Sequence, residues 1–195
     1  MNAERRVGDR NILDRFTEDF CWVVEKYAKY IVVSGFVAIS TGRSRATEDI
    51  DMIIERMSKE KFIEMHNALD KEGFECMQSS NPEDVFSYLN HGDNVRYTMK
   101  ENKMFPPEMD IHFAKDELDE WQLKERQKIE FTGLDVWFSS VEFNIAFKEE
   151  LLKSDKDMED ARHLRNIFKG NFSEEKINKI KKMINSMRKG ANNEE

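Results

Sequence analysis

A pair of aspartates at the start of a short apolar run constrains this chain more than any other stretch. Asp49 and Asp51 alternate with Ile50 and lead directly into Met52-Ile53-Ile54, a pattern typical of a buried strand. Because side chains alternate between faces along a strand, both carboxylates are expected on one face, roughly 6.5–7 Å apart along the backbone. Two like charges on a half-buried surface repel each other, and a divalent cation between them would remove the conflict. The stretch therefore predicts a metal site on a sheet.

A third carboxylate occurs in a later predicted strand. Asp110 alternates with apolar residues over residues 109–113, so it shares a face with His112. If the two strands are neighbours, three carboxylates can hold two Mg²⁺ or Mn²⁺ ions about 3.5–4 Å apart. Taken alone, Asp110 is better explained as a water-exposed residue at a strand end, and the upstream acid pair is what favours a metal ligand. His112 is expected beside the metal and not on it, because Mg²⁺ prefers oxygen ligands.

A glycine turn and a basic loop lead up to the acid pair. The apolar residues 31–33 predict a first strand that ends at Ser34-Gly35, followed by a short helix that ends at Gly42. A glycine turn at a helix start is a reasonable phosphate cradle. Arg43 and Arg45 are candidates to hold a triphosphate or the leaving pyrophosphate. An exposed basic loop explains Arg43 equally well, so Arg45, which is closer to the acid pair, is the preferred candidate.

The remaining periodicity predicts an α/β (α+β) protein with a mixed sheet flanked by helices and a helical C-terminal part. The boundaries expected are 1–138 for the α/β domain with its N-terminal helix and 139–195 for a helical segment packed on it. Helices are predicted over residues 11–29, 58–70, 82–89, 116–126, 141–152, 156–168 and 173–188, and strands over 48–55, 74–77, 95–99 and 109–113. Residues 128–131 and 134–138 predict a hairpin about Thr132-Gly133.

The composition favours a protein of the cytoplasm. Of the 195 residues, 39% are hydrophobic and 36% charged, and no apolar run approaches the ~20 residues that span a bilayer. No signal-peptide pattern follows Met1, so no membrane partner is expected. Cys21 and Cys76 lack metal-ligand spacing and are expected to pack as small apolar side chains. A net charge of −8 argues against broad nucleic-acid binding, although the basic residues 176–189 leave room for a local basic path; a solvated amphipathic helix is the simpler explanation.

The order of these motifs resembles the DNA polymerase β-like nucleotidyltransferase superfamily, and within it AbiEii-type toxins and minimal nucleotidyltransferases. The family pattern is an apolar strand, Gly-Gly or Gly-Ser, a spacer, Asp-x-Asp, and a later Asp on another strand. Here Gly35-Phe36 is followed by twelve residues and then the acid pair, and Arg45 and Thr47 match a subfamily in which Arg and Thr precede it. Phe36 departs from the pattern, because it offers a backbone N–H but no hydroxyl; Ser34 is then the substitute, or phosphate binding is weaker.

The resemblance continues into the helical part. Residues 142–148 end on Lys148, at the place of a family lysine that contacts phosphate, and Lys156-Asp157 with Asp160 resembles a Lys-Asp-x-x-Asp phrase. By this resemblance one of Asp157 and Asp160 is expected to hydrogen-bond the base or ribose, or to pair with Lys148. Acids are also favoured in the first turn of any helix by its dipole, which explains Asp157 without a ligand.

The resemblance implies a metal-dependent nucleotidyltransferase that transfers NMP from an NTP to an acceptor hydroxyl. The acceptor stays open among an RNA or tRNA end, a protein and a small molecule, and a toxin role would imply a cognate antitoxin partner. The alternative is a catalytically inactive NTP-binding or partner-binding protein, which Phe36 favours; the retained carboxylates oppose it, because without a metal they cost stability. The predicted catalytic and metal residues are Asp49, Asp51 and Asp110, and the predicted nucleotide-binding residues are Ser34, Gly35, Phe36, Arg45, Thr47, Lys148 and Asp157.

Overall fold

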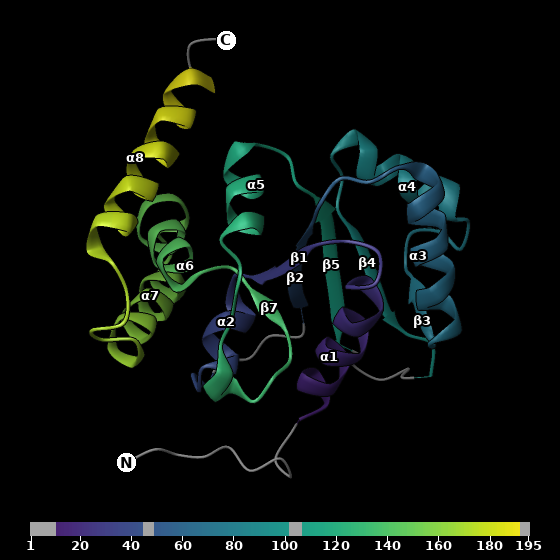
Figure 1. Ribbon diagram of the computed structural model, residues 1–195, viewed down its shortest axis with the longest axis horizontal. Helices are drawn as coiled ribbons and strands as arrows, with labels where there is room; N and C mark the ends of the chain where they lie inside the picture. The colour runs from purple at the N-terminus through teal and green to yellow at the C-terminus, as the bar shows by residue number, and fades with distance from the viewer. Residues whose placement is uncertain (1–10, 45–48, 102–106, 192–195) are drawn as a thin grey trace.

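The computed structural model describes residues 11–44, 49–101 and 107–191, and within them seven strands form one mixed sheet (Figure 1). The strand order is β3-β4-β5-β2-β1-β7-β6. The pairs β2–β5 and β1–β7 are parallel, and the other neighbouring pairs are antiparallel. This sheet confirms the predicted fold class. The strands are β1 (Tyr30–Val33), β2 (Asp49–Ile54), β3 (Phe74–Cys76), β4 (Val95–Met99), β5 (Glu108–Phe113), β6 (Gln127–Lys128) and β7 (Trp137–Phe138).

Helices flank the sheet, and most of them begin at a polar side chain that caps the first turn. In Figure 1, α1, α3 and α4 lie on the β3–β4 side of the sheet, and α6, α7 and α8 lie beyond β1 and β7. The capping side chains belong to Asn11, Ser58, Asn81, Asp116, Ser140 and Ser154. The helices are α1 (Ile12–Val24), α2 (Gly35–Ser40), α3 (Lys59–Lys71), α4 (Pro82–His91), α5 (Glu117–Lys124), α6 (Val141–Phe147), α7 (Asp155–Ile167) and α8 (Glu174–Ala191), with a 3₁₀ turn η1 (Glu130–Thr132) and a π-helical turn η2 (Lys148–Leu152).

The strands that carry the acids divide their side chains between two cores. Ile50 and Met52 of β2 and Ile111 of β5 face the main core, which also holds the aromatic side chains under α1 and α3. Ile53 of β2 lies on the opposite face, in a smaller core with Leu123 of α5. Asp49 and Asp51 are at alternate positions from Ile50, so they share the face of this smaller core. The acid pair therefore lies on the face of the sheet that carries the smaller core.

The hairpin predicted about Thr132-Gly133 is present, but its strands are much shorter than the predicted 128–131 and 134–138. The paired strands are only the two-residue β6 and β7, and η1 lies between them. The hydroxyl of Thr132 donates to the carbonyl of Ile129 at 2.7 Å and accepts from the N–H of Leu134 at 3.2 Å. Ile129 and Leu134 are buried in the main core. The apolar pattern therefore marks a buried connection instead of a strand ladder.

Two predicted helices also end early. The first ends at Val24, although apolar periodicity extends to residue 27. The helix predicted over residues 141–152 changes to a π-helical turn at Lys148 and closes at Lys153, whose φ is 56°. Both changes occur where the chain must turn to reach a neighbouring element, which periodicity does not show.

One face of the C-terminal helix packs into the protein interior. Ile177, Ile180 and Ile184 of α8 are buried in the main core, next to residues of α6. The domain boundary at residue 138 stays a prediction. Buried side chains from before and after this residue pack together in one core. In the described part of the chain, no helix combines the length and apolar character needed to cross a bilayer.

Candidate functional site

The acids predicted on separate strands are brought together by the pairing of β2 with β5. These strands run parallel, with Asp51 opposite Asp110 and Asp49 opposite Glu108. Backbones of neighbouring strands lie about 4.8 Å apart, and side chains at paired positions point to the same face. Asp49, Asp51, Glu108 and Asp110 therefore occupy one end of one sheet face.

The carboxylate of Asp110 is held by polar side chains of the β4 region. Asn94 donates to Oδ1 of Asp110 at 2.7 Å, and Nε of Arg96 lies 3.4 Å from Oδ2. Arg96 also reaches Glu108 at 3.4 Å. Sequence reasoning missed Arg96, Asn94 and Glu108, because their role depends on the cross-strand position of Arg96 opposite Asp110.

Asp51 lies at a half-buried position where a negative charge is unfavourable. Burial raises the pKa of Asp51 above its ordinary range, a hydrogen bond from Ser34 partly offsets the rise, and the charges of Asp110 and Asp49 add to it. Carboxylate oxygens in this number suit a hard cation such as Mg²⁺, which would relieve the repulsion. Among the described residues, however, no three His, Cys, Asp or Glu side chains are gathered closely enough to hold a metal ion. Metal binding by Asp49, Asp51 and Asp110 stays a prediction.

In the turn between β1 and α2, the residue with a positive φ is Ser34, one position before Gly35. Ser34 has φ 63° and ψ −130°, a region that residues other than glycine rarely adopt. Gly35 is the first residue of α2, and Phe36 is 1% exposed, with its ring 6.4 Å from that of Phe138. The side chain of Phe36 is therefore a core side chain, and only its backbone N–H remains as a candidate for a phosphate. The hydroxyl at this turn comes from Ser34.

A pocket of about 300 Å³ lies between this sheet face and the helices that follow it; we call it the Asp51 pocket. Asp49 and Asp110 do not line it in the described structure, although both flank Asp51. Its polar wall consists of Ser34, Asp51, Asn94, His112, Asp119, Gln122, Asn144 and Lys148, and its apolar wall of Val33, Ile53, Phe143, Phe147, Leu151 and Leu152. The pocket thus joins Ser34 and Asp51 to Lys148, as a nucleotide site would require.

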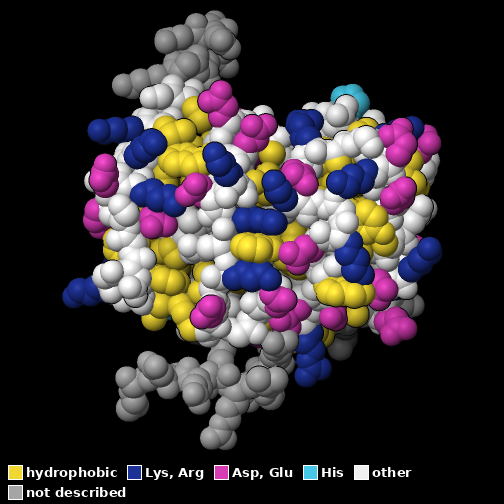
Figure 2. All heavy atoms as spheres, in the orientation of Figure 1, with side chains coloured by type: hydrophobic (Ala, Val, Ile, Leu, Met, Phe, Trp, Pro, Cys, Tyr) yellow, Lys and Arg dark blue, Asp and Glu magenta, His cyan; other side chains and the backbone are white. Residues whose placement is uncertain are grey.

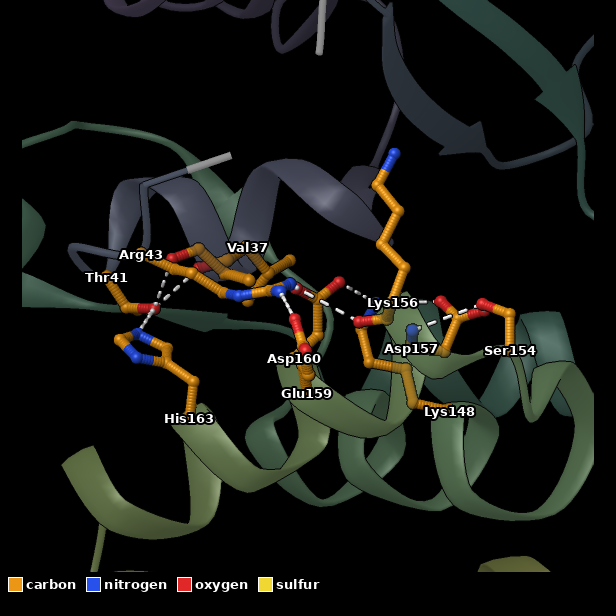
Figure 3. Close-up of polar contacts among 11 residues, drawn as sticks. Val37, Thr41, Arg43, Lys148, Ser154, Lys156, Asp157, Glu159, Asp160 and His163 are labelled. Atoms are coloured by element: carbon orange, nitrogen blue, oxygen red, sulfur yellow. Dashed lines mark hydrogen bonds and ion pairs between the residues drawn. The ribbon is translucent and has the colours of Figure 1, made fainter. Parts of the chain in front are cut away.

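Lys148 is buried in an ion-pair network at the edge of this pocket (Figure 3). Its Nζ lies 2.8 Å from Oδ2 of Asp160 and 3.4 Å from Oδ1 of Asp157. The side chain of Asp160 is fully buried, and the Ser154 hydroxyl donates to Asp157. Of the two roles expected for Asp157, the pairing with Lys148 is the one present here.

Arg43 joins the same network from the end of α2. Its guanidinium forms ion pairs with Asp160 and Glu159 and donates to the carbonyl of Lys156 at 3.3 Å. Figure 3 shows these side chains bridging α2 and α7. Arg43 is therefore neither an exposed loop residue nor turned toward a nucleotide; it anchors the loop to α7. Arg45 and Thr47 lie outside the described residues.

Neither a protein-family model nor a curated protein sequence matches this chain. Among solved structures, it is similar to the antibiotic-resistance factor ANT(2'')-Ia, with a TM-score of 0.56 and 13% sequence identity. The match covers 93% of this chain and 95% of that one. An identity this low shows the fold alone, and the narrower resemblance to AbiEii-type toxins stays a prediction. The chain has a nucleotidyltransferase-type fold.

Proposed function

We propose that this chain is a metal-dependent nucleotidyltransferase that transfers NMP from an NTP to an acceptor hydroxyl. The observation that carries the proposal is the pairing of Asp51 with Asp110, close to Asp49, together with a pocket that is lined by Asp51 and extends to Lys148. The fold neighbour ANT(2'')-Ia is itself a nucleotidyltransferase, which supports the same general activity.

Each of these residues has a distinct role in such a reaction. A Mg²⁺ or Mn²⁺ ion bound by Asp49, Asp51 and Asp110 would neutralise phosphate charge and lower the pKa of the acceptor hydroxyl. Asp110 accepts the hydroxyl proton as the acceptor oxygen bonds to the α-phosphorus and the bond to pyrophosphate breaks. Ser34 orients the Asp51 carboxylate through its hydrogen bond. Holding both reactants in line supplies much of the rate.

Lys148 and the apolar wall of the pocket serve the nucleotide. Lys148 lines the pocket, but its ammonium is held by Asp160 and Asp157, so contact with a triphosphate requires it to exchange one of these carboxylates for a phosphate oxygen. Phe147 and Leu151 line the same pocket and suit the flat face of a base.

One observation favours the alternative of a nucleotide-binding protein without transfer. Asp110 is already paired with Arg96, and a carboxylate neutralised by a guanidinium does not need a metal. The transferase requires Asp110 to exchange this partner for a cation. Both proteins would bind NTP, so only turnover separates them.

The test is incubation with labelled NTPs, Mg²⁺ and candidate acceptors. Asp51→Asn and Asp110→Asn are expected to lower transfer by about 100-fold or more, because each removes a ligand of the reacting phosphate's cation. Asp135→Asn is the matched control, since Asp135 is 81% exposed and pairs with Lys128 on the surface, away from the Asp51 pocket. Absence of transfer, with NTP binding retained in Asp49→Asn and Asp51→Asn, would favour the alternative.

Metal binding has a readout that does not depend on turnover. At a Mg²⁺ concentration 100-fold above Kd, binding adds about 2.7 kcal/mol of stability, which raises Tm by roughly 5–10 °C for a chain of this size. The rise should occur in the wild type and in Asp135→Asn but not in Asp51→Asn. An equal rise in Asp51→Asn would contradict the assigned metal site.

The acceptor is the least constrained part of the proposal. A tRNA-like acceptor gains weight if the basic residues 176–189 line the acceptor site, but Lys176 pairs with Glu125 and Lys181 with Glu149. Deleting residues 173–195 would also remove buried core residues, so Lys179→Gln/Lys182→Gln is the better variant. Weaker RNA binding with a shallower salt dependence would support a tRNA-like acceptor, and unchanged binding would remove it.

A toxin role, with a cognate antitoxin as partner, is the narrowest form of the proposal. It predicts that expression of the wild type arrests growth and that expression of Asp51→Asn does not. Normal growth with the active enzyme would separate the transferase from the toxin role.

A further inference from the structure

A second pocket, of about 560 Å³, lies on the other side of α5 from the Asp51 pocket; we call it the Arg56 pocket. The Asp51 pocket uses Asp119 and Gln122 of α5, whereas the Arg56 pocket uses the neighbouring positions Glu120 and Lys124. The two pockets are therefore separated by the width of one helix. The Arg56 pocket is lined by Lys29, Glu55, Arg56, Ala114, Glu120, Leu123, Lys124 and Arg126.

Four of these side chains are cations: Lys29, Arg56, Lys124 and Arg126. In the part of the chain that the structure describes, none of the four forms an ion pair with a carboxylate. Neighbouring cations without counter-charges repel each other, and a bound anion relieves that repulsion. Of the four, Arg126 is half-buried, whereas other half-buried cations such as Lys181 are paired with a carboxylate.

The two arginines are held in place by contacts that do not use up their charge. Nε of Arg56 donates to the carbonyl of Ala114 at 3.0 Å. Arg126 donates to the carbonyl of Tyr30 at 3.5 Å, and its guanidinium lies 4.3 Å from the centre of the Trp137 ring. A guanidinium carries several N–H donors in a rigid plane, so each arginine keeps donors for a planar or tetrahedral anion.

The acids in the pocket do not cancel this charge. The carboxylate of Glu55 accepts the backbone N–H of Lys29 at 2.8 Å, and Glu120 is exposed on α5. Four cations against two acids leave a formal charge of +2 in a chain whose total is −8. Figure 2 shows Lys and Arg side chains in the middle of the face drawn, interspersed with Asp, Glu and apolar side chains. A ligand with more than one negative charge fits this balance.

We propose that the Arg56 pocket binds phosphate groups of a polyanion, at a site separate from the Asp51 pocket. The phosphates can come from a compound such as a polyphosphate or nucleotide, or from the backbone of a nucleic-acid strand, since both present the same chemistry to arginine and lysine. The proposal does not depend on nucleotide transfer.

The test uses the full chain, sodium tripolyphosphate as the probe, and EDTA to exclude divalent cations. Amide chemical shifts are followed by NMR during the titration and are expected to change first at Lys29, Arg56, Ala114 and Lys124. The double variant Arg56→Gln/Lys124→Gln should bind roughly tenfold more weakly, because it removes two of the charged contacts.

Two further variants guard against a loss of folding. Lys29→Gln/Lys124→Gln changes only exposed side chains and should weaken binding similarly. Lys61→Gln/Lys71→Gln makes the same charge change on α3 and should leave the affinity unaltered. Shift changes confined to the Asp51 pocket would overturn the proposal, as would binding by both pocket variants within twofold of the wild type.

A single-stranded RNA of twelve nucleotides distinguishes the two sources. RNA that binds more tightly than tripolyphosphate, and is weakened by the same variants, identifies a strand backbone; its salt slope should fall by about 0.7 for each phosphate contact removed. Tripolyphosphate binding without RNA binding identifies a small phosphate compound. Absence of binding by both probes refutes the site.

Discussion

The buried pair of Lys148 with Asp160 offers the sharpest test of how the helical part is joined to the sheet. Lys148 is 1% exposed and Asp160 is fully buried, with Nζ and Oδ2 2.8 Å apart. Asp160 also pairs with Arg43, so this carboxylate lies between two cations, and each cation has a second carboxylate partner, Asp157 for Lys148 and Glu159 for Arg43. Replacing Lys148 by the similarly shaped Met, or Asp160 by Leu, leaves a buried charge with less compensation. Replacing both removes the pair altogether.

The expected magnitudes follow from the burial of both partners. Breaking a buried ion pair by removing one partner costs about 3–5 kcal/mol, whereas replacing both by apolar side chains is often much less costly. Lys148→Met should therefore lower Tm by roughly 6–20 °C, at about 2–4 °C for each kcal/mol. Arg43 remains beside residue 160 in the double variant, but it keeps Glu159 and the carbonyl of Lys156 as partners. The double variant should be no less stable than Asp160→Leu.

Urea unfolding of the wild type, both single variants and the double variant completes a thermodynamic cycle. Lys153→Met provides the control, because Lys153 is 52% exposed and pairs with Glu150 at 3.3 Å on the surface; its cost should stay below about 1 kcal/mol. A cost below about 1 kcal/mol for Lys148→Met, or additive costs in the double variant, would show that the pair does not stabilise the fold in this way.

Three further predictions concern separate parts of the fold. Burial would raise the pKa of Glu149, but hydrogen bonds from Arg165 and Lys181 outweigh the effect of burial and lower this pKa. The ionised carboxylate therefore stabilises the fold at pH values above the ordinary pKa of 4.5, and this stability is lost as the pH falls through the folded-state pKa. Glu149→Gln should cost about 1 kcal/mol at pH 7 and progressively less as the pH falls below 4.5 in urea unfolding, and a pH-independent cost would contradict the linkage. Ser34→Gly should be about 1–2 kcal/mol more stable than Ser34→Ala, because both lose the hydroxyl but only glycine tolerates φ 63°; equal stabilities would argue against strain at this turn. Ile180→Ala should cost about 2–5 kcal/mol by thermal unfolding because it opens a cavity in the core, and a cost within about 0.5 kcal/mol would mean that α8 is not packed as described.

Much of the secondary structure could be predicted because its signals are local. The strand at Asp49 was visible from alternation, and α3 and α5 from the capping residues Ser58 and Asp116. The length of the strands around Thr132 could not be predicted, because it depends on contacts that are not local in the sequence. A buried loop and a buried strand both consist of apolar residues, and only the neighbours that bury them distinguish the two.

The candidate site shows the same division. The acids Asp49, Asp51 and Asp110 were found from their apolar surroundings, since a carboxylate within a strand pattern is costly without a partner. The partner Arg96 was not found, because a charged residue at an exposed strand position carries no local mark of its role. Lys148 was found by resemblance, and a pairing with Asp157 or Asp160 was among the expected roles; only the packing of η2 against α7 shows that it pairs with both.

The sequence by itself determined which residues form strands and helices and which carboxylates are out of place on a buried face. Periodicity, caps and turn residues act within a few positions of the chain, so these properties are present before the chain folds. Only the tertiary structure decided that β2 lies beside β5, that Ser34 takes the strained turn beside Asp51, and that four cations meet across α5 from that site. These features join residues far apart in the chain, and their free energies depend on burial and on charges that the folded protein alone brings together.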